Sequence, residues 1–174
     1  MQVNIRIAGR DDAELIADLS RKTFYDTFAP DNTKENMDRF MREQFSRSAL
    51  MQEVGEKDSI FFLAYADDQP VGYARLREKG LRFGLENKSP IEIARIYAVN
   101  DKIGKGVGSA LMQQCMDTAR EMKKEVIWLG VWKKNHRAVD FYTKWGFEIF
   151  GEQDFILGRD VQKDWLMKKD LDQQ

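Results

Sequence analysis

Residues 91–108 read IEIARIYAVNDKIGKGVG, a strand-forming run that passes into a glycine-rich loop. An i, i+4 apolar stripe beginning at Leu111 predicts a helix after the loop, and the apolar run 125–132 predicts a further strand. A strand, helix, strand unit normally places its two strands parallel and adjacent, with a right-handed crossover. The sequence therefore predicts a parallel strand pair, with the glycine loop where the first strand meets the helix.

The segments on either side of this unit predict a mixed α+β fold. We expect a central mixed sheet of about six or seven strands flanked by helices. Before the unit, the sequence predicts a strand at 3–8, a helix to about residue 25, helices through 37–45 and 50–54, and a hairpin of strands at 59–65 and 71–77. Between the hairpin and the unit, 80–90 is a predicted loop with buried apolar anchors at Leu81, Phe83 and Leu85. After the unit, the sequence predicts a further helix at 136–145 and strands at 147–157 and 165–168.

Composition limits the class of protein. The chain has 174 residues, enough to bury about 70% of its unfolded surface, so we expect a single domain over 1–174. With 28 basic and 29 acidic residues the net charge is −1, and neither nucleic acid nor an anionic membrane is an expected partner. The apolar run 60–66 is too short to span a membrane and 1–12 lacks the apolar core of a secretory signal, so we expect a cytoplasmic protein. One cysteine, Cys115, and one histidine, His136, exclude an internal disulfide and the familiar zinc patterns, and no metal is expected.

The glycine loop has two interpretations. Alternating glycines at the start of a helix let the backbone approach a phosphate closely, with free N–H groups and the helix dipole directed at the charge. A plain tight turn would use the same residues. The spacing G-x-G-x-G matches neither the Walker A pattern nor the dinucleotide pattern G-x-G-x-x-G, which disfavours an ATP-hydrolysing motor and a nicotinamide dehydrogenase.

Two linked blocks resemble the GCN5-related N-acetyltransferases (GNAT). Gly106 and Gly108 match the acetyl-CoA signature Gln/Arg-x-x-Gly-x-Gly/Ala, and N-x-x-A-x-x-F-Y-x-x-x-G-F over 135–147 is similar to the C-terminal signature. Ile103 departs from the pattern, because the family usually has Gln or Arg there. The segments FYDTF at 24–28, IEIARIY at 91–97 and IWLGVW at 127–132 further resemble the PaiA-type spermidine/spermine acetyltransferase branch.

The resemblance implies a GNAT fold with acetyl-CoA as cosubstrate, held in a V-shaped opening between the two parallel central strands. Pantetheine amides would pair with the strand ending at Val99, and the pyrophosphate would meet backbone N–H groups of the glycine loop. Asn135 would bond the pantetheine arm, although Asn before a helix is also an ordinary N-cap. The implied cofactor-binding residues are Ile96, Tyr97, Ala98, Val99, Gly104, Lys105, Gly106, Val107, Gly108, Ser109, Asn135, Tyr142 and Lys144.

Two side chains are candidate catalytic groups. Tyr142 is placed by the resemblance to protonate the departing thiolate, the alternative being simple packing beside Phe141. Glu92 interrupts an apolar strand and could take the proton of the amine, but a salt bridge, for example with Arg95, explains it equally well. Cys115 lies on the apolar helix stripe, which favours a core thiol and direct transfer over an acyl-enzyme.

The expected acceptor is a small cationic amine, with a polyamine favoured by the resemblance. Tyr25, Asp26, Phe28 and Trp132 are the predicted substrate-binding residues, and Asp26 begins an acidic cluster with Asp31, Glu35 and Asp38. A solvated acidic loop is the alternative for that cluster. A noncatalytic acyl-CoA-binding regulatory protein on the same fold is the competing function, and the oligomeric state, a homodimer included, stays open.

Overall fold

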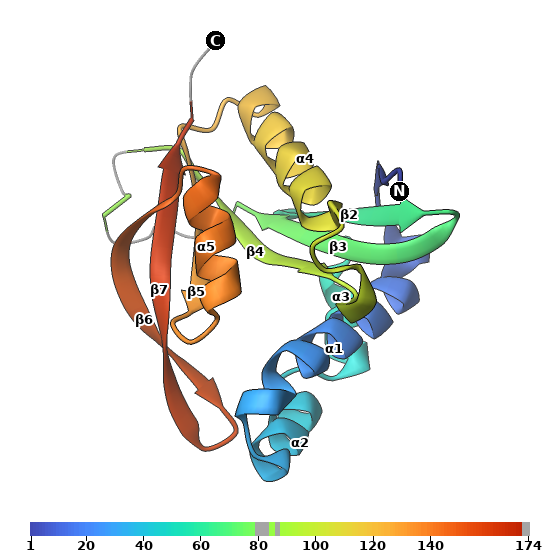
Figure 1. Cartoon of the computed structure of the whole chain (residues 1–174). Coiled ribbons are helices and arrows are strands. Elements are labelled where there is room, and N and C mark those ends of the chain that lie inside the picture. Colours follow the sequence, from blue (N-terminus) through green and yellow to red (C-terminus); the bar gives the residue numbers. More distant parts are fainter. Residues whose placement is uncertain (79–83, 86–87, 172–174) are drawn as a thin grey trace.

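A computed structural model describes residues 1–78, 84–85 and 88–171 of the chain (Figure 1). Its centre is a seven-stranded sheet in the order β1-β2-β3-β4-β5-β7-β6, and only the β4–β5 pair is parallel. The predicted mixed sheet and its parallel pair are thus confirmed. The strands are β1 (Asn4–Ile7), β2 (Ser59–Ala66), β3 (Gln69–Arg77), β4 (Pro90–Ala98), β5 (Val126–Trp132), β6 (Glu148–Leu157) and β7 (Asp160–Asp170).

Helices cover the sheet in two groups. The helices α4 (Val107–Glu121) and α5 (His136–Lys144) pack into one core cluster with the strands of the sheet. The helices α1 (Ala13–Phe28), α2 (Lys34–Glu43) and α3 (Arg47–Glu53) lie away from α4 in Figure 1. They contribute to two further clusters, one of which is rich in phenylalanine. Short 3-10 turns at Arg10–Asp12, Ala29–Asp31 and Asn100–Lys102 connect these elements.

The parallel pair is joined over a short length only. β4 and β5 are in register from Pro90 opposite Val126 to Glu92 opposite Trp128, and no pairing continues beyond that point. β4 then follows β3 and β5 follows β7, so the two strands diverge (Figure 1). A bulge at Ala94 interrupts the β3–β4 ladder immediately after the last paired residues. Backbone groups on the facing edges of β4 and β5 therefore lack strand partners.

Two details of the elements differ from the expectations. β7 begins at Asp160, five residues earlier than the predicted strand, because polar residues open it. The hairpin turn consists of Asp67 and Asp68, with φ of 50° and 62°, a conformation that short aspartates tolerate better than most residues. Much of the predicted loop 80–90 lies outside the described residues, but Leu85 is buried beside Val126, as the prediction of buried anchors required. No helix in the described part of the chain is long and apolar enough to cross a membrane.

Candidate active site

A cavity of about 590 Å³ opens where β4 and β5 diverge. Backbone and side chains from 93–98 of β4 form one wall, and Gly130, Val131 and Trp132 of β5 form the facing wall. The glycine loop and α5 close one end, while phenylalanines from α1 and α2 close the other. One end of the cavity is therefore rich in backbone donors and the other is aromatic.

The glycine loop offers unused backbone donors to this cavity. Of residues 104–109, only Lys105 donates its amide hydrogen to another described residue, the Lys102 carbonyl. Gly104 and Gly106 have φ of 80° and 92°, in the left-handed region that favours glycine. A Cβ at either position would meet no protein atom within 4 Å, and both residues line the cavity. The N-terminus of α4 thus presents free N–H groups to open space, an arrangement suited to a phosphate.

The first turn of α5 forms the neighbouring wall. The Asn135 side chain accepts a hydrogen bond from the Ala138 amide at 3.3 Å, which caps the helix, and Asn135 also lines the cavity. Both readings of this residue are therefore compatible with the structure. Ile103 lines the cavity at the position where the resembled family usually has Gln or Arg. Arg137 also lines the cavity and carries a positive charge there, and the sequence analysis did not identify it. In the sequence, only the position of Arg137 in the first helical turn after Asn135 could have indicated it.

Tyr142 faces the cavity from α5 and is only 8% exposed. Its ring packs edge-on against Phe141 and Phe147, and within the described residues its hydroxyl has no hydrogen-bond partner. Burial, with a smaller contribution from the Cys115 thiol, raises the pKa of Tyr142 above the ordinary phenol value. The phenol is therefore protonated throughout the neutral range and can donate a proton. Cys115 itself is fully buried, and burial raises its pKa to about 12.

Aromatic rings surround the other end of the cavity. Phe24 stacks on Phe28 and Phe40 with ring centroids 4.3 and 4.6 Å apart, and Phe28 lies 5.4 Å from Trp132. Phe155 of β6 adds a further ring 5.7 Å from Phe40. Sequence reasoning identified Phe28 and Trp132 but missed the other rings. The helical spacing of Phe24 and Phe40 is equally typical of a plain helix core, and Phe155 lies on a separate strand.

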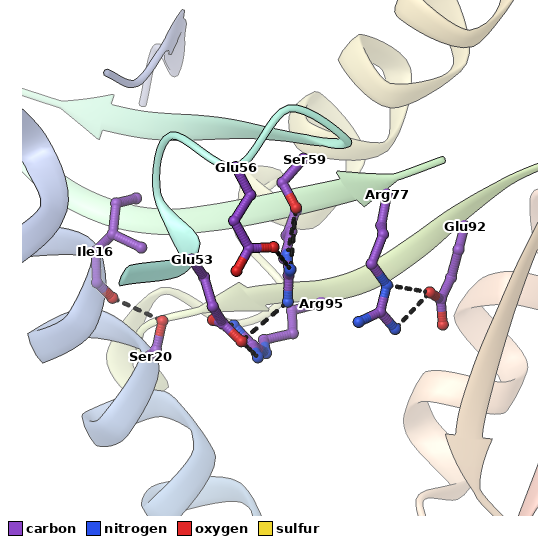
Figure 2. Close-up of polar contacts among 9 residues, drawn as sticks. Ile16, Ser20, Glu53, Glu56, Ser59, Arg77, Glu92 and Arg95 are labelled. Carbon is purple, nitrogen blue, oxygen red and sulfur yellow. Dashed lines mark hydrogen bonds and ion pairs between the residues drawn. The ribbon is translucent and has the colours of Figure 1, made fainter. Parts of the chain in front are cut away.

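A buried ionic network supports the β4 wall (Figure 2). Arg95, which lines the cavity, donates to both Glu53 carboxylate oxygens at 2.7 and 2.9 Å. Arg75, only 3% exposed, donates to Glu53 at 3.1 Å and to Ser59 at 3.0 Å. Burial opposes ionisation of Glu53, but the hydrogen bonds and charge of Arg95, with the charge of Arg75, lower its pKa overall. The network joins α3 to β3 and β4 and compensates the Arg95 charge inside the protein.

Glu92 lies outside the lining of the cavity. It occupies the last paired position of β4, and its carboxylate accepts hydrogen bonds from Arg77 at 2.6 and 2.8 Å (Figure 2). The salt bridge anticipated for Glu92 is present, but its partner is Arg77; the suggestion of Arg95 was wrong because Arg95 is held by Glu53. The proton-accepting role of Glu92 stays a prediction that this geometry does not favour.

The remaining predicted residues divide by position. Tyr25 and Asp26 do not line the cavity, unlike Phe24 and Phe28 of the same helix. Asp26 pairs with Lys22 at 3.1 Å. Val99, Val107, Lys105 and Lys144 do not line the cavity: Val99 is half-buried, Val107 is buried, and the two lysines are exposed. The predicted residues that line the cavity are Ile96, Tyr97, Ala98, Gly104, Gly106, Gly108, Ser109, Asn135, Tyr142, Phe28 and Trp132.

Comparison with known proteins identifies the family. Residues 21–147 match the model of the Acetyltransferase (GNAT) family. The chain belongs to this family. It is 35% identical over 167 residues to an uncharacterized N-acetyltransferase from Lactobacillus delbrueckii subsp. lactis, with 96% of each chain covered. The prediction of a GNAT N-acetyltransferase that uses acetyl-CoA is confirmed at the level of the family.

More distant relatives carry narrower names. A spermidine N(1)-acetyltransferase from Thermoplasma acidophilum is 26% identical over 156 residues, covering 86% of this GNAT chain and 90% of that relative. The crystal structure of PaiA N-acetyltransferase from the same organism, in complex with coenzyme A, superposes with a TM-score of 0.79 at 22% identity, over 98% and 99% of the two chains. This likeness confirms the GNAT fold and no finer property.

The ionic network predicts a stability effect. Glu53→Gln leaves the Arg95 guanidinium without a carboxylate and Arg75 with Glu56 alone, at 3.4 Å, and we expect a loss of about 3 kcal/mol in the free energy of unfolding at pH 7. Because the Glu53 pKa is lowered in the folded state, its stabilisation is present above the ordinary carboxyl pKa and is lost as the pH falls below about 4.3. Urea unfolding at pH 7 and pH 3.5 measures both effects.

Glu43→Gln is the matched control for this experiment. Glu43 forms an exposed pair with Arg39 at 3.1 Å on α2, and such pairs contribute little. Equal destabilisation by the two variants would contradict the structural role of Glu53.

Proposed function

We propose that this GNAT protein transfers the acetyl group of acetyl-CoA to a small primary amine by direct attack in a ternary complex. The observation that carries the proposal is that one cavity is lined by the diverging strands, the glycine loop with its free amides and Tyr142. Cys115 lies in the core outside the lining, so the residues offer no thiol for an acyl-enzyme.

The donor-rich end suits the cofactor. The pyrophosphate would accept hydrogen bonds from the amides of Gly104, Gly106, Gly108 and Ser109, which no other described residue uses. The pantetheine arm would pair with the free edge of β4 over 96–98, in the manner of an added strand, and would contact Asn135. Val99 is not part of this edge, because its amide donates to the Val71 carbonyl and its carbonyl accepts from the Lys102 amide, both at 2.9 Å. Arg137 would supply a cation on the wall where Ile103 supplies none, with Lys105 and Lys144 at the exposed rim.

The chemistry follows from these positions. The neutral amine attacks the thioester carbon, forming the C–N bond, and backbone N–H groups at the free edge of β4 stabilise the oxyanion. Collapse breaks the C–S bond, and Tyr142 gives its proton to the thiolate. The acetylated nitrogen then releases a proton that restores the tyrosine, so the net products are an amide, CoA and one proton from the original ammonium.

The proposed acceptor is a cationic amine, with polyamines as the favoured class. Two observations support it: the distant likeness to a spermidine N(1)-acetyltransferase and the aromatic walls around Phe28 and Trp132, which suit a cation. The acidic cluster that begins at Asp26 gives no support, because it does not line the cavity. A cytoplasmic location and a homodimer stay predictions.

The glycine loop provides a binding test. Gly106→Val places a branched side chain into the cavity from a backbone with φ of 92°, and we expect CoA affinity to fall at least about tenfold. Isothermal titration with CoA measures it. Gly106→Ala is the matched control, since it also places a Cβ on the left-handed backbone but adds less bulk and less strain, and it should retain more affinity than the valine variant. Undiminished binding to a folded Gly106→Val protein would contradict the pyrophosphate assignment.

Tyr142 provides the catalytic test. Tyr142→Phe removes a hydroxyl that has no hydrogen-bond partner among the described residues, so the fold should persist, while turnover should fall roughly 10²- to 10⁴-fold. Steady-state CoA release and CoA titration separate turnover from binding, which we expect to be unchanged. Wild-type turnover, with chemistry shown to be rate-limiting, would reduce Tyr142 to a packing residue.

A further inference from the structure

We propose that Asp164 selects the acceptor by binding an ammonium group other than the one that is acetylated. The inference rests on the proposed acetyltransferase function and deepens it. Sequence reasoning missed this residue, because the predicted final strand began one residue later, at Trp165.

Asp164 is built into the cavity wall by the sheet. It pairs with Trp132 of β5 on one side and with Gln153 of β6 on the other, so the three side chains share one face. Gly130, two residues before Trp132, leaves the space that these side chains use. A Cβ there would lie 2.8 Å from the Gln153 amide nitrogen and 3.6 Å from Asp164 Oδ2. The Gln153 side chain hydrogen-bonds to the carboxylate and so fixes its direction.

The described residues around the cavity leave the Asp164 carboxylate without a counter-charge. Among the described residues, Asp164 is the one acidic side chain in the lining. The Arg95 guanidinium is already bound by both oxygens of Glu53, and Arg137 lies on the exposed first turn of α5 beside Asn135. Among the described residues, no lysine, arginine or histidine side chain forms a salt bridge with Asp164.

Burial makes this carboxylate receptive to a cation. Asp164 is only 9% exposed, and burial raises its pKa despite the hydrogen bond from Gln153. A buried carboxylate without a counter-charge is costly, and an ammonium ion entering the cavity would remove that cost. The rings of Trp132 and Phe155 line the same part of the cavity and present π-faces that also attract a cation.

The topology indicates which nitrogen Asp164 would bind. β7 lies beyond β5, so Asp164 is displaced by about one strand spacing, roughly 4.8 Å, from the opening in which the thioester would lie. A carboxylate in contact with the attacking amine would also hold that amine in its protonated, unreactive form. Asp164 is therefore placed to anchor a second ammonium, which stays charged throughout the reaction.

The test compares butane-1,4-diamine with butylamine, two acceptors that share a four-carbon chain and differ by the second cation. We expect the wild-type protein to prefer the diamine. In Asp164→Asn, kcat/KM for the diamine should fall at least about tenfold, mainly through KM, while kcat/KM for butylamine changes little. Asp154→Asn is the matched control, because Asp154 lies on the same hairpin but is exposed and paired with Lys163. It should retain the wild-type preference.

A binding measurement keeps the assignment independent of turnover. In the presence of CoA, the diamine should raise the unfolding temperature of the wild-type protein and of Asp154→Asn, but not that of Asp164→Asn. The variant itself should unfold at the same temperature as wild type or higher, since it removes a buried charge with a raised pKa.

Two results would overturn the role of Asp164. One is an unchanged diamine preference and unchanged thermal protection in Asp164→Asn. The other is loss of both in Asp26→Asn with Asp164→Asn unaffected, which would move recognition to the acidic cluster. Failure of the wild-type protein to acetylate any amine, with thermal protection by the diamine still dependent on Asp164, would instead reject the proposed function and leave the ammonium site intact.

Discussion

The structure depends on a parallel strand pair that is hydrogen-bonded over only a short part of its length. β4 and β5 share three paired positions, and beyond Glu92 and Trp128 each strand stays with its other neighbour. Strand edges without partners carry N–H and C=O groups that water or a ligand must satisfy. The opening therefore creates both the space for a cofactor and the hydrogen-bonding capacity that attracts one. The bulge at Ala94 lies at the point of divergence, where the ladder to β3 is also interrupted.

An opening of this kind needs walls that do not collapse, and the two walls are supported differently. The β5 wall is held by the regular β5–β7 ladder, and β7 in turn pairs with β6, while the β4 wall is backed by the network of Glu53, Arg75 and Arg95. A buried ion pair contributes less to stability than an apolar contact of the same size would, because desolvation offsets the attraction. Its geometry is specific, however, and it fixes the Arg95 side chain in place without leaving a free positive charge facing the acceptor.

The sequence predicted the backbone of the site better than its side chains. Gly104 and Gly106 could be assigned because a left-handed φ at a helix start restricts the residue type, and the parallel pair followed from hydrophobic patterning. The acceptor end was harder, because the inward or outward direction of one side chain depends on register. Asp26 and Asp164 are both aspartates near aromatic residues in the sequence. Asp26 does not line the cavity because of the helix face on which it lies, whereas the cross-strand partners of Asp164 place it in the cavity wall. For Glu92, the sequence indicated a charge needing a partner but not which arginine supplies it.

The two ends of the cavity are under different constraints. Backbone amides make up most of the proposed phosphate site, so many sequences can preserve it provided that glycine stays at the positions with positive φ. Side chains make up the acceptor end, and a single change such as Asp164 to a neutral residue alters its charge without disturbing the sheet. GNAT relatives at 26–35% identity can therefore share the donor and the fold while differing in acceptor. The acceptor class of this protein therefore depends on its own carboxylate and aromatic rings, which the shared fold does not determine.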